Sequence, residues 1–548
     1  MRLKKLLNNY SVLLILILFF LVSDIKAQSL SDPIMTQQGP VVGEVLGDTV
    51  TFRGIPYAEP PVGNLRWQSP QSAKPRSGVL NAIKFGSRCC QVGTPDGNIL
   101  GGTKTFMGSE DCLTLNIWAP KAKENTLRPV MFFIHGGGNV QGSGANPLYD
   151  GKNLTEKGGV ILVTINYRLA QFGFLAHPQL TAEDKNQSSG NYALLDQIMA
   201  LDWVRDNIKN FGGDPNNITI FGESAGGVNV FCLVASPLAA GKFQRAIVES
   251  GGFGVNVSLK DTANSSQVES AEEFGLRFVK ESGCGTSSDP IACLRSKNPE
   301  DIFKILTGEA SVINRFNGST VYGPNLDGYV LKESPIVALQ ANRHNNVPIM
   351  IGTNKDEATI FTIMLPIDTK AGYRKIVKSL FPSISKQILK QYPTTDYPSP
   401  RDAFNTFFTD LSFVCPARWA GLMSSINQPQ TFVYSFTNTF EIPQVKPFGA
   451  FHGQELLFVF NNFLNIPPSQ DQRKLGETML GYWTNFAKTG DPNGVGLPNW
   501  PRHNQSSDSY QVLNVNITSQ SGLRKDFCAF LSKAVLGMNL CNSCGKKE

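Results

Sequence analysis

The sequence predicts an α/β protein in which helices flank a large, mostly parallel central sheet. Short apolar runs with the length of buried strands recur along its 548 residues. Between two of these runs, apolar residues recur every three or four positions, which is typical of an amphipathic helix. Strands that alternate with helices favour parallel pairing, because each helix carries the chain back across the sheet. With 41% hydrophobic and 17% charged residues, the chain can bury a large core.

The elements and the domain follow from these patterns. The helix is defined by Leu194, Leu195, Ile198, Leu201, Val204 and Ile208, and the strands are the runs 129–134, 159–165, 218–221, 244–248, 347–351 and 431–436. Length alone suggests about three domains. However, two chemically coupled residues identified below, at positions 224 and 452, must meet. We therefore predict that residues 28–548 form a single domain with long insertions and a short cysteine-containing C-terminal tail.

The most informative motif is a serine between glycines. Residues 222–227 read GESAGG, which fits the pattern G-x-S-x-G, and the predicted strand 218–221 precedes them. In this pattern a sharp strand-to-helix turn leaves the serine oxygen exposed above the sheet, and the glycines relieve crowding in the strained turn. Ser224 is therefore the candidate nucleophile for acyl transfer.

A serine hydroxyl needs a base, normally a histidine that a carboxylate orients, and in this type of turn the chain order is Ser, Asp or Glu, then His. Three of the five histidines follow Ser224. His503 adjoins an N-glycosylation pattern, which predicts a surface position. His344 lies in a polar turn that leaves little room for an acid before it. His452 remains, between glycines at 449 and 453 and before an apolar run.

The acid and the oxyanion loop each follow a predicted strand. The strand 347–351 is followed by Thr353-Asn354-Lys355-Asp356-Glu357, and on chemistry alone either Asp356 or Glu357 could orient His452. The strand 129–134 runs into His135-Gly136-Gly137-Gly138, an HGGG loop whose backbone N–H groups can approach a reacting carbonyl. His135 is predicted to stabilise this loop.

Together these motifs resemble the type-B carboxylesterases, the family that includes the cholinesterases. Further markers are FRGIPYA at 52–58, SEDCLTLN at 109–116 and NYR at 166–168, and the match covers nearly all of the mature chain. The resemblance implies an α/β-hydrolase fold and a serine carboxylic-ester hydrolase that works through an acyl-enzyme without cofactor or metal. It selects Glu357 over Asp356 as the acid. It also implies oxyanion donors at the backbone N–H groups of Gly137, Gly138 and Ala225.

The chain has ten cysteines, which indicate disulfides if the protein is secreted, as its first residues predict below. The family resemblance implies three pairs, Cys90–Cys112, Cys284–Cys293 and Cys415–Cys528. Of the others, Cys232 follows the nucleophile on a helix and is predicted to be a free core thiol. Cys541 and Cys544 could pair with each other or between chains, and metal binding is the least favoured role; Cys89 is left without an assignment.

The resemblance also identifies candidate pocket residues. Cholinesterases hold their cationic substrate against a tryptophan in the first disulfide loop, but Phe106 is the only aromatic residue of 91–111 here. A second choline-side aromatic is replaced by Ile360. The acyl side is expected to comprise Thr320, Tyr322 and Phe361, a less crowded set than the acetyl-selective pattern. Asn139 follows the HGGG loop where the family usually carries an aromatic residue. These departures predict an esterase that is not choline-selective.

The first residues predict the compartment. Basic residues and then the apolar run 12–22 form a secretory signal peptide, which we expect to comprise residues 1–27. No membrane span is expected after its removal, and the protein is expected to be secreted or to lie in the lumen of a secretory-pathway vesicle. After the predicted signal peptide, the N-x-S/T patterns, candidate glycosylation sites, begin at Asn153, Asn186, Asn217, Asn256, Asn264, Asn317, Asn504 and Asn516.

The net charge of +6 is mild and scattered, which argues against nucleic-acid binding. The expected partner is a small-molecule or lipid ester, and the expected assembly is a monomer or homodimer. Two alternatives share the fold: a catalytically inactive binding protein, and a structural or storage protein of a secretory vesicle. An intact set of Ser224, Glu357, His452 and HGGG loop favours the esterase.

Overall fold

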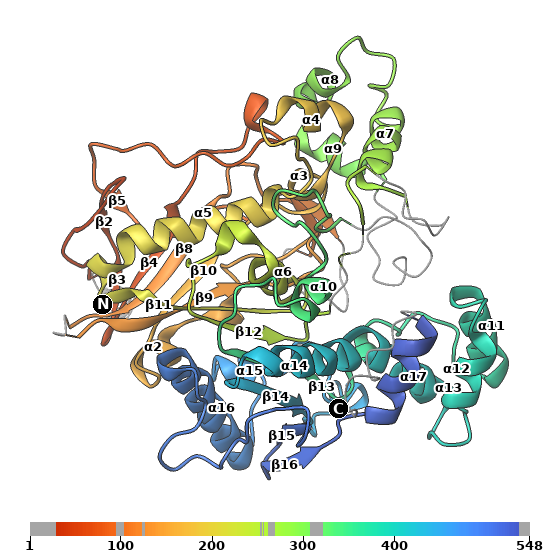
Figure 1. Cartoon of the computed structure of the whole chain (residues 1–548). Helices are drawn as coiled ribbons and strands as arrows, with labels where there is room; N and C mark the ends of the chain where they lie inside the picture. The colour runs from red at the N-terminus through yellow and green to blue at the C-terminus, as the bar shows by residue number, and fades with distance from the viewer. Residues whose placement is uncertain are drawn as a thin grey trace, which may run out of the picture.

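The computed structural model describes residues 29–94, 104–122, 126–252, 255, 257–260, 269–306 and 322–535. Its centre is an eleven-stranded sheet (Figure 1). The predicted signal peptide, Thr320, Cys541, Cys544 and three candidate glycosylation sites, Asn256, Asn264 and Asn317, lie outside the described residues. Among the residues that are described, no helix has both the length and the apolar character needed to cross a membrane.

The sheet is mixed, with a parallel centre and antiparallel margins, as the predicted α/β-hydrolase fold requires. The strands from β15 to β10 pair in parallel, and antiparallel pairs join β16 to β15, β10 to β8, β8 to β4 and β4 to β3. In spatial order the strands are β16 (Thr518–Ser521), β15 (Ser509–Leu513), β14 (Thr431–Phe436), β13 (Ile349–Asn354), β12 (Arg245–Glu249), β11 (Gly213–Glu223), β9 (Arg128–Ile134), β10 (Ile161–Ile165), β8 (Thr114–Pro120), β4 (Thr49–Pro56) and β3 (Glu44–Leu46). Every predicted strand is therefore confirmed as a member of this sheet.

Helices lie on both faces of the sheet. The α-helices are α2 (Lys152–Glu156), α3 (Ala170–Phe174), α4 (Pro178–Glu183), α5 (Tyr192–Asn207), α6 (Ala225–Ala235), α7 (Ala271–Glu281), α8 (Pro290–Ser296), α9 (Pro299–Lys304), α10 (Pro335–Gln340), α11 (Lys370–Leu380), α12 (Ser385–Gln391), α13 (Pro400–Thr409), α14 (Cys415–Asn427), α15 (Leu456–Val459), α16 (Gln470–Thr489) and α17 (Lys525–Val535). Two small sheets comprise β1 (Ile34–Thr36), β2 (Gly39–Val42) and β5 (Leu80–Asn81), and β6 (Gln91–Gly93) with β7 (Thr105–Met107).

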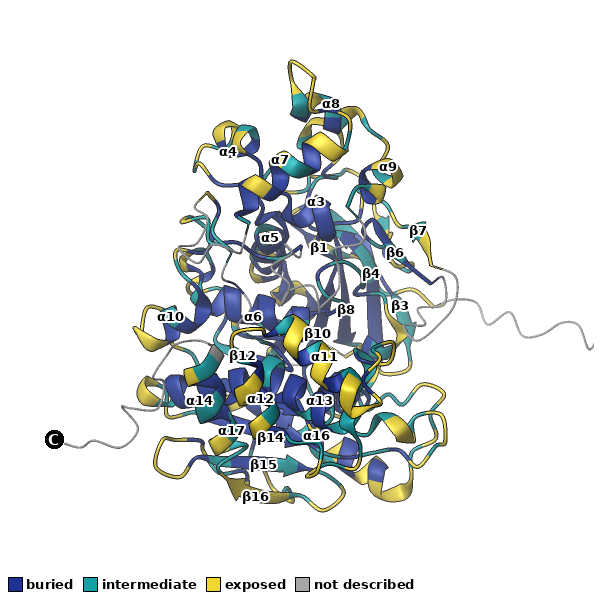
Figure 2. Ribbon diagram, turned by 90° about the vertical axis from the view of Figure 1, so that its right-hand side faces the viewer, coloured by how far each residue is buried: buried dark blue, intermediate teal, exposed yellow. Residues whose placement is uncertain are grey.

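The alternation of side chains along a strand divides the core into two layers. In β9, Val130 and Phe132 face the layer that contains α5 and α6, whereas Met131 and Phe133 face the layer built on α15 and α16. Figure 2 shows β4, β8 and α5 made up mostly of buried residues, and exposed residues on outer helices such as α11. Both faces of the central strands are therefore covered, which explains their nearly continuous apolar sequences.

Helix α5 is confirmed, but it is less amphipathic than its spacing predicted. Asp196, on what would be its polar side, is fully buried. Asp196 accepts hydrogen bonds from the guanidinium of Arg168 at 2.8 Å and 2.7 Å, so its charge is paired inside the protein. Such a pairing depends on a residue far from the helix in sequence, and periodicity cannot reveal it.

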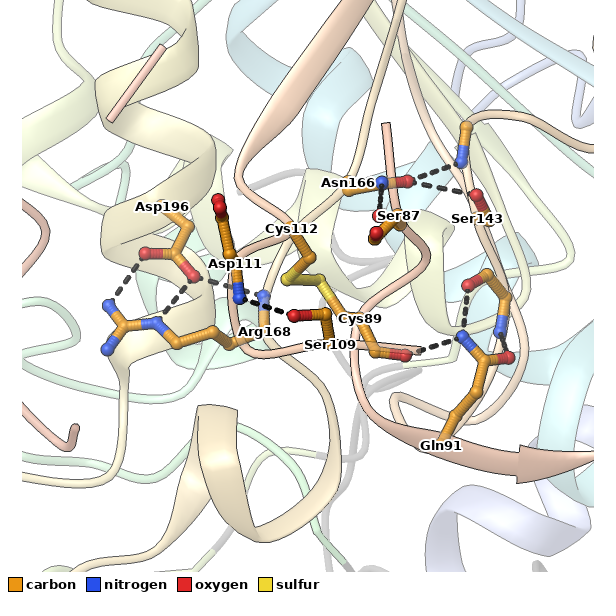
Figure 3. Close-up of a disulfide and its surroundings, with 12 residues drawn as sticks. Ser87, Cys89, Gln91, Ser109, Asp111, Cys112, Ser143, Asn166, Arg168 and Asp196 are labelled. Atoms are coloured by element: carbon orange, nitrogen blue, oxygen red, sulfur yellow. Dashed lines mark hydrogen bonds and ion pairs between the residues drawn. A yellow bond between two sulfur atoms is a disulfide. The ribbon is translucent and has the colours of Figure 1, made fainter. Parts of the chain in front are cut away.

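The predicted Cys90–Cys112 disulfide is wrong by one residue. Cys89 bonds Cys112, with their Cα atoms 5.0 Å apart, whereas Cys90 is a buried free thiol (Figure 3). Successive side chains of an extended segment point to opposite sides, so only one of two adjacent cysteines can face a given partner. Burial, the largest effect, raises the pKa of the Cys90 thiol to about 12. The pairs Cys284–Cys293 and Cys415–Cys528 are confirmed, and Cys232 is a buried free thiol as predicted.

The predicted surface position of His503 is also wrong. His503 is 2% exposed, and its Nδ1 lies 2.7 Å from the carbonyl oxygen of Ser509 at the start of β15. The adjacent Asn504 is exposed. A polar N-glycosylation pattern therefore predicts the environment of the asparagine but not that of its neighbour, whose side chain turns into the protein.

Candidate active site

Ser224 occupies the sharp turn between β11 and α6. Its φ is +58°, a value that a residue with a side chain adopts only under strain, and its N–H donates to the carbonyl of Glu249 at 2.9 Å. A Cβ at Gly226 would lie 2.0 Å from the carbonyl oxygen of Ile134, and one at Gly222 would lie 2.7 Å from the same atom. The glycines of the motif are thus required because the turn packs directly against the end of β9.

The HGGG loop leaves β9 and lies against this turn. A Cβ at Gly136 would be 3.1 Å from the Cβ of Ser224, which brings the loop beside the candidate nucleophile. Gly137 has a φ of +104°, and a Cβ there would lie 2.1 Å from the carbonyl oxygen of Gln141. The Gly136 contact places the HGGG loop close to Ser224, and Ala225 is the next residue in the chain.

His135 holds the start of the loop. Its ring stacks on Tyr167 with centroids 4.4 Å apart, and the Tyr167 hydroxyl donates to the His135 carbonyl at 2.6 Å. Burial lowers the pKa of His135 to about 4, so its imidazole is neutral at physiological pH. Packing and a low pKa fit the predicted loop-stabilising role and do not suit a general base.

The far end of the loop is tied to the first disulfide. Gln91 donates through its side-chain amide to the carbonyls of Cys89 and Gly142, both at 2.9 Å, and accepts from the Gly142 N–H at 3.0 Å. Figure 3 shows Gln91 on one side of the Cys89–Cys112 disulfide and the Arg168–Asp196 pair on the other. The disulfide therefore stabilises the segment that follows the glycines.

His452 lies beside Glu357, on the loop that follows β14. Its Nδ1 donates to Oε2 of Glu357 at 2.5 Å, and the imidazole is 8% exposed. The other carboxylate oxygen of Glu357 accepts from the Ser250 hydroxyl at 2.5 Å and from the Asn354 N–H at 2.7 Å. The three hydrogen bonds fix this fully buried carboxylate in one orientation.

The neighbouring carboxylate has a different environment. Asp356 accepts a hydrogen bond from the Ala450 N–H at 2.9 Å through Oδ2, and burial raises its pKa. It thus holds the loop that carries His452, while Glu357 contacts the imidazole. Asn354 adds a second support to this loop, because its side-chain amide donates to the Phe451 carbonyl at 2.7 Å.

A second carboxylate, which sequence reasoning did not identify as functional, faces the other ring nitrogen. Oε1 of Glu223 lies 3.1 Å from Nε2 of His452. Burial disfavours the charged imidazole, but Glu223 and Glu357 outweigh it and raise the pKa of His452 to about 9. Burial also raises the pKa of Glu223 to about 7. The position of Glu223 inside the GESAGG motif is the signal that could have drawn attention to it.

Further buried acids surround these groups. Glu249 and Glu455 are fully buried; Glu249 bonds Trp483 of α16, and Glu455 bonds the side chain of Asn354. Burial raises the pKa of both carboxyl groups. So many carboxylates cannot all be ionised in a low-dielectric interior, and a raised pKa here means that protons are retained on some of them near neutral pH.

Aromatic rings form a wall against His452. Phe361 and Phe413 each lie with their ring centroid 4.9 Å from that of His452, and they stack on each other at 6.0 Å. Phe361 was a predicted pocket residue, whereas Phe413 was missed because no motif surrounds it. Ile360 ends the short 3₁₀ helix η7 (Glu357–Ile360) and lies next to Phe361 in the chain.

The other predicted pocket residues make different contacts. The ring of Phe106, in β7, packs on Phe303 of α9 at 5.8 Å. The ring of Tyr322 packs edge-on against Phe274 of α7 at 5.5 Å. Both therefore belong to the helical region around α7 and α9, and these contacts do not place them at the imidazole. Within the described ranges, no group of three or more metal-ligating side chains is arranged to hold a metal ion.

Comparison with known proteins assigns this geometry to a family. The model of the carboxylesterase family matches residues 31–531. The chain belongs to the carboxylesterase family. It is 35% identical over 477 residues to fumonisin B1 esterase of Sphingopyxis macrogoltabida, a match that covers 85% of this chain and 84% of that protein. It is 32% identical over 550 residues to a protein of Dictyostelium discoideum named crystal protein, with 95% of each chain covered.

Solved structures agree with this carboxylesterase assignment. A structure of PNB esterase is 32% identical in sequence, has a TM-score of 0.76, and the match covers 91% of this chain and 99% of that one. The predicted family and the α/β-hydrolase fold are thereby confirmed, and carboxylic-ester hydrolysis is the activity that the carboxylesterase family indicates.

Proposed function

We propose that this carboxylesterase-family protein is a secreted serine esterase that hydrolyses carboxylic esters through an acyl-enzyme intermediate and has no preference for choline esters. The observation that carries the proposal is the hydrogen bond between Glu357 and Nδ1 of His452. The other ring nitrogen of His452 faces Glu223, the residue before Ser224. A serine, a carboxylate and an imidazole, in that order along the chain, are the parts of an acyl-transfer site.

In the proposed mechanism, Ser224 Oγ attacks the ester carbonyl while Nε2 of His452 takes the hydroxyl proton. Glu357 holds the imidazole in the correct tautomer and stabilises its charged form. The backbone N–H groups of Gly137, Gly138 and Ala225 bind the oxygen on which negative charge develops. The imidazolium then gives its proton to the leaving alcohol, and a water molecule, activated in the same way, releases the acid and restores Ser224.

The substrate class is proposed from the walls of the site. Phe361 and Phe413 present an apolar surface beside His452, which suits an uncharged acyl chain. The segment between the bonded Cys89 and Cys112 contains no tryptophan that could hold a quaternary ammonium group. Neutral esters, including aryl esters and short lipid esters, are therefore the expected substrates.

The deciding experiment compares the purified protein with Ser224→Ala. The unaltered protein should hydrolyse a generic aryl ester, and an organophosphate should label Ser224 stoichiometrically and abolish the activity. Ser224→Ala should lose both activity and labelling but keep its thermal unfolding temperature. Labelling of another residue, or equal turnover by the variant, would falsify the proposed mechanism.

A second candidate function is structural. It draws on the 32% identity to the Dictyostelium protein named crystal protein over 95% of both chains. In this case the fold would serve assembly inside a secretory vesicle, and the purified protein would leave aryl esters intact at any acyl length. The labelling experiment separates the two candidates directly, because the esterase requires a reactive Ser224 and the structural role does not.

We also propose that the protein is secreted and glycosylated. Three disulfides occur among the described residues, and such bonds persist in oxidising compartments. Asn504 and Asn516 are exposed, so we expect glycans there. The side chains of Asn153 and Asn217 instead contact Asn461 and Arg245, and Asn186 is partly buried. Glycosidase treatment of secreted protein, followed by peptide mass mapping, should find the two exposed sites modified first.

A further inference from the structure

One wall of the candidate site contains a segment of unusual helical form. Residues Asp410–Val414 form a π-helix, η8, between α13 and α14. π-Helical segments are rare, and they are frequently found at functional sites. Phe413, the aromatic residue that packs on His452 and Phe361, belongs to this segment. The position of its ring beside the imidazole therefore depends on how η8 is held.

Residues in and directly before η8 contact the candidate site at two more points. Thr409, directly before η8, accepts a hydrogen bond at 3.1 Å from the N–H of Ala358, the residue after Glu357. The carbonyl oxygen of Ser412 lies 2.9 Å from the position of a Cβ on Gly252, close in sequence to Ser250, which donates to Glu357. A shift of η8 would therefore first displace the aromatic wall beside His452 and the turn after Glu357.

Both ends of η8 are tied to one element, the C-terminal helix α17. At the first residue, Asp410 accepts from Arg524, which directly precedes α17, at 2.9 Å from Nε and 2.5 Å from Nη2. The Asp410 side chain is 2% exposed and also accepts from the hydroxyl of Tyr392 at 3.0 Å. Directly after the last residue, Cys415 forms its disulfide with Cys528 of α17.

We propose that α17 acts as a clamp on η8, and that Asp410 and Arg524 are positioning residues that set the width of the acyl side through Phe413. Loss of Arg524 leaves a buried carboxylate without its charge partner, which is strongly unfavourable. The segment can relieve this only by moving Asp410 toward water or by taking up a proton. Either change loosens the turn that carries Phe413. This inference rests on the proposed esterase function, because the width of the wall matters only for an acyl group bound there.

The test is Arg524→Gln, measured as the ratio of kcat/KM for p-nitrophenyl octanoate to that for p-nitrophenyl acetate. A looser wall should admit the long chain better and hold the short one worse, so we expect this ratio to rise roughly tenfold, the scale on which apolar pockets discriminate chain length. Phe413→Ala should raise the ratio as well. In the double variant Arg524→Gln/Phe413→Ala, the ratio should rise by less than the product of the two single increases, because both substitutions act on one ring. Arg524→Lys should restore part of the original ratio.

The matched control is Arg418→Gln. Arg418 lies in α14, the helix that directly follows η8. Its ion pair with Asp508 is also largely buried, with side-chain exposures of 4% and 11%, against 31% and 2% for Arg524 and Asp410. This variant should lower the thermal unfolding temperature without changing the ratio. The double variant Cys415→Ala/Cys528→Ala releases the other end of the clamp and should change the ratio in the same direction as Arg524→Gln.

Hydrogen exchange gives a readout that needs no catalysis. In Arg524→Gln the amides of residues 410–414 and of Ala358 should exchange faster than in Arg418→Gln. Equal exchange in the two variants, or an unchanged acyl ratio in an active Arg524→Gln enzyme, would overturn the clamp and leave the proposed function intact. If the unaltered protein hydrolyses no ester, the proposed function fails, and the exchange comparison still decides whether α17 holds η8.

Discussion

The two halves of the candidate site are held in place by different forces. The backbone half, residues 134–138 and 222–227, is fixed by close packing of main-chain atoms, with Cβ positions at Gly226 and Gly137 only 2.0 Å and 2.1 Å from carbonyl oxygens. The carboxylate half, Glu357, His452 and the groups that bond them, is fixed by side-chain hydrogen bonds and buried charge. The glycines that permit this close packing are visible in the sequence as motifs. Restraints from buried charge depend on partners brought together by the whole fold.

The largest effect of a single substitution is expected in the carboxylate half. Glu357→Gln should lower kcat by about 10⁴-fold, because a neutral amide favours the wrong tautomer of His452 and no longer stabilises the imidazolium. Asp356→Asn should remain nearly normal, since Asp356 bonds a backbone N–H at Ala450 and does not bond the imidazole. Steady-state kinetics of the two variants on one aryl ester would decide. The opposite ranking would mean that the acid is Asp356.

The backbone half is tested by Gly137→Ala. The added Cβ would meet the Gln141 carbonyl, so the backbone of the HGGG loop must shift. We expect kcat to fall by about 10²- to 10³-fold, as for loss of one oxyanion donor. Gly241→Ala is the control, because its φ is also positive, at +71°, but no atom lies within 4 Å of the new Cβ. Equal kinetic losses in both variants would show that backbone strain, and not the loop position, is responsible.

A smaller effect is expected on the pH dependence, from the buried carboxylate beside Nε2 of His452. His452 must be neutral to act as a base, so kcat/KM rises with pH through its pKa, which Glu223 and Glu357 hold above the ordinary value at about 9. Glu223→Gln removes a charge from beside Nε2 and should move this acid limb at least about one unit to lower pH. The measurement is a pH profile of kcat/KM, with Asp356→Asn as a charge-matched control. An unmoved limb would show that Glu223 carries no charge in the free enzyme.

The smallest effect concerns the alcohol group of the substrate. Without a tryptophan between Cys89 and Cys112, a choline ester should be hydrolysed within about tenfold of a neutral ester of the same size, since the cation gains no aromatic partner. Butyryl and longer esters should be accepted at least as well as acetyl esters. The measurement is kcat/KM for matched choline and neutral esters across acyl lengths. A strong preference for acetylcholine would require another aromatic residue at the cation site, with Phe106 as the first candidate.

The same division explains what the sequence could predict. The strands, the turn at Ser224 and the HGGG loop follow from local patterns, because apolar runs and glycines encode them directly. Glu357 could be chosen over Asp356 only through the family resemblance, and the structure places Glu357 against the imidazole. Phe413 and the pairing of Cys89 were missed. Both depend on which way a side chain faces after distant segments pack, and no motif records that direction.

The contacts between α17 and η8 also affect the order in which parts of the protein can fold during synthesis. The Cys415–Cys528 bond spans 113 residues, and Arg524 lies near the end of the described chain. Contacts so distant in sequence form late, because a long segment must be closed before they yield any stabilisation. The strands up to β12 and the turn at Ser224 can assemble while later residues are still on the ribosome, but the wall beside His452 must wait for α17. A nascent chain would thus carry the turn at Ser224 in its final shape well before the wall beside His452 is formed.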